Sequence, residues 1–383
     1  MGPSLALALV TFVTVTAAMS VLVRGNRSIR FLRDVTTALP PQAPRVSVIV
    51  AARNESPNIE SALESLLAQD HPDYEVIVVD DRSNDATPEI LARAQANHAA
   101  LRVIRIDTLP DGWLGKNHAL QCGAAAASGA ILIFADADVV MRSDCVRRSV
   151  AHTLAASRDH LAITPEMISP GLMLSMFMSA FTMFFSLCAR PWKAADPKSS
   201  AFIGIGAFNL VRADVYRALG GHTRIAMRPD DDIKLGKIIK QAGYSQEMLF
   251  GRGMIGVEWY PSVAALARGL EKNTLAGVDY RIAAIVIGAV VQTILFVWPF
   301  AALAFTSGPT LAINAATCLL LLAACAEQTR FVGVPRWHAA GLPVATVLLI
   351  FILLRATWVT VRDGGINWRG TYYPLAALRA NRI

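Results

Sequence analysis

Long apolar segments constrain this chain more than any other feature of its sequence. They lie at residues 5–23, 171–188 and about 281–361, whereas the stretches between them have the composition of an ordinary globular protein. A run of about 20 apolar residues is long enough to cross a bilayer as a helix. With 54% hydrophobic and 17% charged residues, the chain is too apolar for an ordinary soluble enzyme. The sequence therefore predicts a soluble-type domain held at a membrane.

The first apolar segment is predicted to be an uncleaved anchor, residues 1–24. No basic residue precedes it, and it is followed by Arg24, Arg27, Arg30 and Arg33. A cleaved signal would carry its positive charge first, and the positive-inside rule places the arginines in the cytoplasm. We therefore expect an integral protein of a bacterial inner membrane whose main domain faces the cytoplasm.

In the C-terminal transmembrane region, residues 281–361, the expected number of membrane crossings conflicts with the distribution of basic residues. Three further spans are expected there, at about 281–305, 309–326 and 338–361. Three crossings would leave the basic tail, residues 362–383, outside the cell, against the charge rule. Either one of these segments is re-entrant or interfacial, or the rule fails here. A crossing at 171–188 would also split the main domain, so an interfacial helix or a buried apolar wall fits better there.

Between the apolar segments, strand and helix patterns alternate. A continuous apolar run typical of a parallel strand covered on both faces occurs at Val46–Ala52. Further strands are expected at Glu75–Val79, Leu101–Ile106 and Ile131–Ala135. The first helix is expected to have Ser56 as its N-cap and Pro57 in its first turn. This alternation predicts an α/β domain over residues 42–275, with a Rossmann-like, mostly parallel sheet.

Charged residues follow three of these four strands, and an open α/β sheet binds ligands at that edge. The charged sequences are Arg53-Asn54-Glu55, Asp80-Asp81 and Asp136-Ala137-Asp138. Each alone could be a helix cap or a solvated loop residue, but their coincidence at one edge favours a site. Two carboxylates close together suit Mg²⁺ or Mn²⁺ that substrate phosphates also hold. Lys116 and Asn117, at a predicted helix start, favour a phosphate or another anion, although Lys116 alone could equally be a solvated lysine.

Several classes of protein are excluded by what the sequence lacks. It has neither a G-x-G-x-x-G fingerprint nor a P-loop, and its five cysteines have no zinc spacing. The net charge of +7 is not gathered in a basic cluster with interleaved aromatic residues, so no nucleic-acid partner is expected. We expect a reducing compartment without a disulfide framework.

An acidic run, Asp230-Asp231-Asp232, opens a later predicted helix. Acidic residues in a first helical turn are favoured by the helix dipole. Three in a row exceed what capping needs, because like charges repel each other. This run is therefore a second candidate for chemistry, whereas His222 is interpreted as a structural residue.

Together these segments resemble the family 2 glycosyltransferases, over residues 46–273 and Gly364–Leu378. The matching pieces are VSVIVAARNE, VIVVDDRSND, GWLGKNHAL, FADADV, GIGAFNLVRADVYRALGGH and DDDIKLG. The arrangement of anchor, domain and C-terminal spans is similar to ceramide glucosyltransferase and to hopene-associated and carotenoid glycosyltransferases. The resemblance implies a GT-A fold and transfer of a sugar from a nucleotide donor with inversion at the anomeric carbon.

The resemblance also implies roles for individual residues. The nucleotide pocket would be lined by Ala51, Arg53 and Glu55, with Asp81 and less directly Asp80 at the base, and with Lys116 and Asn117 near the diphosphate or sugar. Asp136 and Asp138 would hold Mg²⁺ or Mn²⁺ against the donor diphosphate. The catalytic base would be Asp232, with Asp231 as the alternative.

The expected acceptor is a membrane lipid that receives one sugar on a hydroxyl group, from a UDP-linked donor, at the cytoplasmic face. Processive family members carry a Q-x-x-R-W motif after the base, whereas this chain has ALARGLEKN there, with Arg268 and no Trp. That difference disfavours a polysaccharide synthase, and it leaves Arg268, Lys272 and Asn273 as acceptor-side candidates. A non-catalytic membrane protein with a sugar-nucleotide fold would have no need of Asp136, Asp138 and Asp232. Nucleotidyl transfer would need a glycine-rich triphosphate loop that AARNES lacks.

Overall fold

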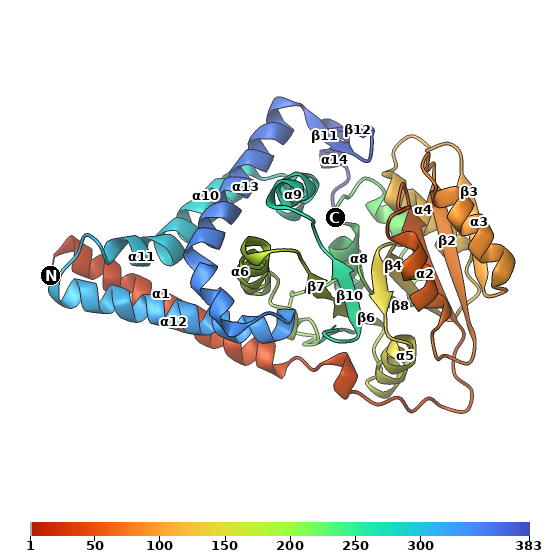
Figure 1. The fold of residues 1–383 in the computed structure, drawn as a ribbon, viewed down its shortest axis with the longest axis horizontal. Coiled ribbons are helices and arrows are strands. Elements are labelled where there is room, and N and C mark those ends of the chain that lie inside the picture. Colours follow the sequence, from red (N-terminus) through yellow and green to blue (C-terminus); the bar gives the residue numbers. More distant parts are fainter. Residues whose placement is uncertain (1) are drawn as a thin grey trace. The chain divides into compact units, whose positions relative to one another are not determined.

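The computed structural model describes residues 2–383, which form two compact units, each made of several separate stretches of the chain (Figure 1). The helical unit comprises the N-terminal stretch up to Ser28, Ser169–Arg190 and Trp259–Ala376. The sheet unit comprises Ile29–Ile168, Pro191–Glu258 and Ala377–Ile383.

A seven-stranded sheet of order β3-β2-β1-β4-β8-β6-β9 forms the centre of the sheet unit. All neighbouring strands are parallel except β8, which runs antiparallel to both β4 and β6. A smaller sheet has the order β5-β10-β7. The strands are β1 (Val46–Ala52), β2 (Tyr74–Asp81), β3 (Leu101–Ile106), β4 (Ile131–Asp136), β5 (Val139–Met141), β6 (His160–Thr164), β7 (Glu166–Ile168), β8 (Asn209–Arg212), β9 (Gln246–Phe250) and β10 (Ile255–Glu258). The predicted mostly parallel α/β sheet is confirmed, and β1 and β3 have the predicted bounds.

Successive strand residues face two hydrophobic layers, as the two-residue period of a strand requires. Val48 and Val50 face a layer that contains residues of α2, α3 and α5, whereas Ile49 faces a layer formed with α4, α7 and α8. The result is a helix–sheet–helix arrangement in which both sheet faces are covered. These helices are α2 (Ile59–Leu67), α3 (Thr87–Asn97), α4 (Gly115–Ala126), α5 (Cys145–Ala155), α7 (Ala213–Ala218) and α8 (Asp231–Gln241).

The loop after β1 corrects the predicted start of α2. The helix begins at Ile59 with Asn58 in the N-cap position, so the assignment of Ser56 as the N-cap is wrong. The Ser56 backbone N–H instead donates to Asp85 Oδ2 at 3.1 Å, and the Glu55 N–H donates to Thr87 Oγ1 at 2.9 Å. The loops after β1 and β2 are thus bonded to each other, which fixes the backbone of Glu55 at the carboxyl edge of the sheet.

The helical unit contains five helices that are long and apolar enough to cross a membrane. They comprise α1, α6, the continuous run α10–η4–α11, α12, and η5 with α13. The unit also contains α9, whose N-cap Ser262 accepts a hydrogen bond from the Ala265 N–H, and a β11–β12 hairpin. The bounds are α1 (Pro3–Ser28), α6 (Leu172–Ala189), α9 (Val263–Gly277), α10 (Ile282–Gln292), η4 (Thr293–Val297), α11 (Trp298–Ala302), α12 (Gly308–Val332), η5 (Arg336–Gly341), α13 (Leu342–Arg362), β11 (Gly365–Trp368) and β12 (Thr371–Pro374). A final helix, α14 (Leu375–Ala380), leads to the end of the chain.

Helices α1 and α12 pack side by side and run in the same direction (Figure 1). Near their C-terminal ends, Asn26 Nδ2 donates to Gln328 Oε1 at 2.6 Å and Arg27 pairs with Glu327 at 2.9 Å. Hydrogen bonds between buried polar side chains of this kind hold membrane helices in register.

Gly236 of α8 allows the helix to approach the backbone before β8, which gives a first testable prediction. A Cβ at residue 236 would lie 1.8 Å from the Ile203 carbonyl oxygen. Because a backbone atom cannot move aside cheaply, Gly236→Ala should cost at least about 3 kcal/mol of unfolding free energy, the upper end for overpacking. Denaturant unfolding of the detergent-solubilised protein measures this loss.

The matched control is Gly288→Ala in α10. No atom lies within 4 Å of a Cβ placed there, so its stability should be unchanged or slightly raised by helix propensity. Equal stability of the two variants would mean that the close approach of α8 is not needed.

Candidate active site

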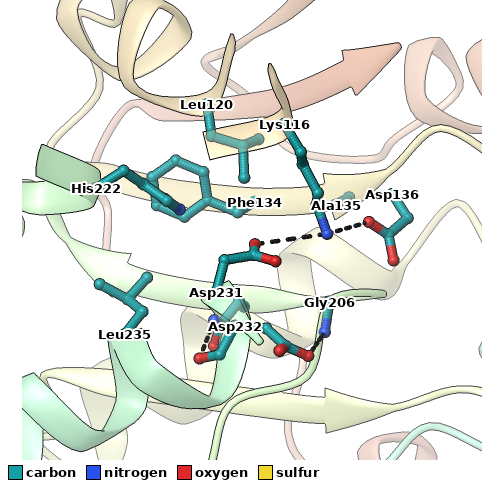
Figure 2. Close-up of a pocket in the computed structure, with 11 residues that line it drawn as sticks. Lys116, Leu120, Phe134, Ala135, Asp136, Gly206, His222, Asp231, Asp232 and Leu235 are labelled. Atoms are coloured by element: carbon teal, nitrogen blue, oxygen red, sulfur yellow. Dashed lines mark hydrogen bonds and ion pairs between the residues drawn. The ribbon is translucent and has the colours of Figure 1, made fainter. Parts of the chain in front are cut away.

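Carboxylates from two separate segments, the end of β4 and the start of α8, meet around the Lys116 side chain at the carboxyl edge of the sheet (Figure 2). The Lys116 Nζ lies 2.8 Å from Asp136 Oδ1 and 3.5 Å from Asp231 Oδ2. Burial alone would lower the Lys116 pKa, but Asp136, Asp231 and Asp232 outweigh it and raise the pKa above its usual value. Lys116 therefore stays protonated and links the end of β4 to the start of α8. The pocket is lined by Lys116, Leu120, Phe134, Ala135, Asp136, Gly206, Asn209, His222, Asp231, Asp232 and Leu235.

Asp138 lies just beyond β4 among other acidic groups. Burial, and then the charges of Asp136 and Glu55, raise its pKa to about 7. Carboxylates that are held together and partly removed from water gain most from a cation between them. This arrangement suits a divalent ion.

Asp136 and Asp138 offer two carboxylates, which are fewer protein ligands than a complete metal site needs. Within residues 2–383, no three His, Cys, Asp or Glu side chains form a metal cluster by themselves. Mg²⁺ is commonly bound through one or two carboxylates, with water and substrate phosphates completing its shell. The residues present therefore fit an ion that arrives with, or is completed by, a phosphate-bearing ligand.

Asp232 is held at the first turn of α8 by backbone donors. Gly206 N–H donates to its Oδ2 at 2.7 Å, and its own neighbour Ile233 N–H donates to Oδ1 at 2.8 Å. Burial, and then the Asp231 charge, raise the Asp232 pKa to about 7, against the opposing effect of Lys116. A carboxyl group whose pKa lies near 7 is suited to accept a proton at neutral pH.

Gly206 and Asn209 were not singled out from the sequence, yet both line this pocket. A Cβ at residue 206 would lie 2.8 Å from Asp136 Oδ2 and 3.5 Å from Asp232 Oδ2, so a larger residue there would displace the Asp136 carboxylate. Asn209 Nδ2 donates to the Asp232 carbonyl at 3.4 Å. Both residues belong to the GIGAFN sequence, which matches a family motif but does not by itself indicate which of its residues line the pocket.

Two buried features hold the backbone that leads into the acidic run. The Asn117 side chain is fully buried and donates to the carbonyls of Ile225, at 2.7 Å, and Arg228, at 2.8 Å. The buried guanidinium of Arg228 bonds both oxygens of Asp230 at 2.8 Å. Asn117 is thus placed to position the loop rather than to touch a ligand, and Asp230 is paired inside the protein.

The predicted nucleotide-pocket residues lie along β1 and β2. Ala51 is in register with Asp136 on the neighbouring strand. Asp81 is buried and lies 2.7 Å from Arg82 Nε and 3.6 Å from Arg53 Nη1. Asp80 is also buried, but it is turned to Arg105 at 3.1 Å and accepts from Ser83 N–H. Asp80 therefore anchors a loop, whereas Asp81 pairs with the two arginines that directly follow β1 and β2.

The acceptor-side candidates belong to α9 of the helical unit. Arg268 is exposed, the Lys272 Nζ lies 4.1 Å from the centre of the Trp368 ring, and Asn273 is half-buried. They are not among the residues that line the pocket around Lys116.

His160 of β6 contacts the pocket residue Asn209, and its burial predicts how the stability of the protein depends on pH. Its Nε2 and Asn209 Oδ1 are 2.5 Å apart, and burial lowers the His160 pKa to about 4. Unfolded chains bind this proton below about pH 6.5, whereas the folded protein does so only near pH 4, so stability falls as the pH drops between these values. His160→Gln should reduce the acid-induced loss of unfolding free energy by roughly 3 kcal/mol. Denaturant unfolding at pH 7 and pH 4.5 measures the difference.

His98→Gln is the control, because His98 is exposed. It should lose as much stability on acidification as the unmodified protein. If His160→Gln did the same, protonation of His160 would not be the cause.

Comparison with known proteins gives a consistent result. Residues 47–220 match the family model described as glycosyl transferase family 2. A 4,4'-diaponeurosporenoate glycosyltransferase of Staphylococcus haemolyticus is 27% identical over 61% of this chain, and this chain spans 61% of that protein's length. The enzyme of the same name from Staphylococcus aureus is 23% identical over 86% of this chain and 88% of its own length.

A solved structure has the same fold. The mannosyltransferase PcManGT from Pyrobaculum calidifontis, in complex with GDP-Man and Mn²⁺, aligns with a TM-score of 0.53 and 21% identity, covering 93% of this chain and 98% of that one. This likeness confirms the GT-A type of α/β fold expected from the sequence.

Proposed function

We propose that this chain, which matches the glycosyl transferase family 2 model, is a glycosyltransferase that moves one sugar from a nucleotide donor, UDP-linked, to a hydroxyl group of a membrane lipid. The reaction would invert the anomeric carbon. The observation that carries the proposal is the Lys116 side chain, which lies 2.8 Å from Asp136, a proposed metal ligand, and 3.5 Å from Asp231, beside the proposed base. The groups for leaving-group stabilisation and for proton removal are thus on one edge of one sheet.

On the donor side, Asp136 and Asp138 would hold Mg²⁺ or Mn²⁺. The ion would act there as a Lewis acid that stabilises negative charge on the departing diphosphate. Lys116 is charged and within reach of the same region, so it would add a second positive charge. Asp81, with Arg53 and Arg82 beside it, would orient the nucleotide base. The Mn²⁺ bound with GDP-Man in the PcManGT complex supports a divalent ion for this fold.

On the acceptor side, Asp232 would take the proton of the attacking hydroxyl group. Inversion requires attack on the face of the sugar opposite the leaving diphosphate, so a single positioned base is sufficient. Its backbone donors, Gly206 N–H and Ile233 N–H, would fix the direction of the carboxylate. Asp231, bonded to Lys116, would serve mainly to hold that lysine.

An apolar, membrane-held acceptor is supported by two observations. Within residues 2–383, five helices are long and apolar enough to span a membrane. Both Staphylococcus relatives are named for an acceptor that is a carotenoid acid. That name favours a second candidate, in which the acceptor oxygen belongs to a carboxylate and arrives already ionised. The proposed base favours the hydroxyl acceptor.

The test is transfer by purified protein in detergent, with radiolabelled UDP- and GDP-sugars, Mn²⁺ or Mg²⁺, and lipid extract. We expect label to enter the organic phase only when the metal ion, one donor and the lipid are all present. Mild alkali separates the two acceptors, because a sugar ester is cleaved whereas a glycoside, which is an acetal, survives. Failure of every donor to label the lipid fraction would contradict the proposal.

A further inference from the structure

We propose that α13, although long and apolar enough to cross a membrane, lies along the membrane surface on the side that holds the sheet unit. Its exposed apolar stripe would contact the acyl chains of that leaflet. This placement follows from the path of the chain and is independent of the glycosyl-transfer proposal.

The start of α13 is on the same side of the membrane as the sheet unit. Helix α12 ends beside the end of α1, where Asn26 bonds Gln328 and Arg27 pairs with Glu327. The sheet unit begins directly after α1, at Ile29. Between α12 and α13, the η5 segment packs against α12 and α6, and a Cβ at Gly341 would meet the Met176 side chain of α6.

Helix α6 itself cannot carry the chain to the other side. It follows β7 and is followed by β8, and both strands belong to the sheet unit. Strand β8 pairs with β4 and β6, which precede α6 in the sequence. Both ends of α6 therefore face the same side of the membrane, as does the η5 segment beside its first turns.

The end of α13 is on that side as well. The β11–β12 hairpin returns the chain to where it left the helix, since Leu375 N–H donates to the Gly364 carbonyl at 2.8 Å. Six residues later, Asn381 bonds the Arg224 carbonyl and the Met227 N–H of the sheet unit, each at 2.9 Å. Six residues span at most about 20 Å, less than the roughly 30 Å hydrocarbon core.

A helix with both ends on one side cannot cross the bilayer. The 21 residues of α13 form one uninterrupted helix, about 30 Å long, with no break at which it could turn back. Three crossings then remain, made by α1, the α10–η4–α11 run and α12. With three crossings in all, the basic tail lies on the same side of the membrane as the sheet unit, in agreement with the positive-inside rule.

The surface of α13 fits an in-plane position. One face is buried within the helical unit, and the opposite face carries large exposed apolar side chains at helical spacing: Val344, Val347, Phe351, Leu354, Trp358 and Val361. Arg355 pairs with Glu271 of α9, and the Arg362 guanidinium lies 4.6 Å from the centre of the Trp358 ring. An apolar stripe flanked by arginine and tryptophan is typical of helices at the membrane interface, whereas an arginine near the bilayer centre is costly.

Depth measurements along the stripe test the proposal. Single cysteines at Val347→Cys, Leu354→Cys and Val361→Cys, in a protein whose five native cysteines are replaced by alanine, would carry a fluorophore quenched by spin-labelled lipids. These positions are about 10 Å apart along the axis. We expect one common depth for all three labels. Depths that change by about 10 Å from one label to the next would overturn the proposal.

The crossing helix α12 provides the matched comparison. Labels at Ala312→Cys, Leu319→Cys and Ala326→Cys have the same spacing, and we expect their depths to differ from one another. This comparison shows that the method resolves a crossing helix in the same protein.

Sidedness gives an independent measurement. An impermeant maleimide applied to sealed vesicles would compare three exposed positions: Ala99→Cys in the sheet unit, Asn367→Cys in β11 and Ser307→Cys before α12. We expect Asn367→Cys to label from the same side as Ala99→Cys and Ser307→Cys from the opposite side. Labelling of Asn367→Cys together with Ser307→Cys would show that α13 crosses. Neither experiment needs a donor or an acceptor, so the result is separate from the proposed activity.

Discussion

Asp232→Asn should lower sugar transfer by about 10²–10⁴-fold, the usual contribution of a general base. The amide keeps the size of the side chain but cannot take the acceptor proton. Because the Asp232 pKa is about 7, the unmodified enzyme should also become faster as the pH rises through 7 and the carboxyl group ionises. That rise should disappear in the variant. Initial rates of label transfer from about pH 5.5 to 8.5, a range that brackets this pKa, measure both effects.

Asp231→Asn serves as the matched comparison for the base. It changes the neighbouring carboxylate, which bonds Lys116 at 3.5 Å rather than the Gly206 N–H. We expect weaker donor binding in Asp231→Asn and nearly unchanged donor binding in Asp232→Asn. If Asp232→Asn turned over normally while Asp231→Asn did not, the role of base would pass to Asp231. If both kept their rates, the ionised carboxylate acceptor would be the better proposal.

Asp138→Ala should abolish the part of donor binding that depends on a divalent ion. Removal of one of two protein carboxylates leaves Asp136 alone to hold the ion, and loss of Lewis-acid stabilisation should reduce transfer by more than about 100-fold. Donor titrations in Mn²⁺ and in EDTA, followed by calorimetry, measure the effect. We expect the unmodified protein in EDTA and the variant in Mn²⁺ to bind the donor equally weakly.

The control for the metal site is Asp107→Ala, whose side chain is 83% exposed and pairs with the exposed Arg105. Its donor affinity should respond to EDTA as the unmodified protein does. A persistent effect of EDTA on Asp138→Ala would place the ion elsewhere.

Much of the sheet could be predicted because its parallel strands are buried on both faces. Runs such as Val46–Ala52 are apolar except for Ser47 for that reason, and the first charged residue after the run marks the carboxyl edge. The same logic predicts Asp136 at that edge, the family resemblance implies Lys116 near the diphosphate, and the structure brings the two side chains to 2.8 Å. Their roles in binding and catalysis stay predictions.

The rest depends on contacts between segments far apart in the chain. Strand β8 has only four residues and runs antiparallel. No pattern in the sequence therefore predicts that Gly206, just before this strand, and Asn209, its first residue, line the site. Asn117 matches a motif, but only the structure shows its amide occupied by the carbonyls of Ile225 and Arg228. Asp80 and Asp81 are neighbours in the sequence, and only the structure shows that they pair with different arginines, Arg105 and Arg82.

The interruption of the sheet unit by α6 has a consequence for how the protein is made. Strands β8 and β9 are synthesised after this apolar helix, yet β8 inserts between β4 and β6. The sheet cannot close until α6 has left the ribosome, so the folding of the sheet unit must wait for an apolar helix that belongs to the other unit. For the same reason, a fragment that starts at residue 29 and ends at residue 258 would still contain 18 consecutive residues of apolar helix. Trimming the two ends of the chain would therefore not release a water-soluble enzyme.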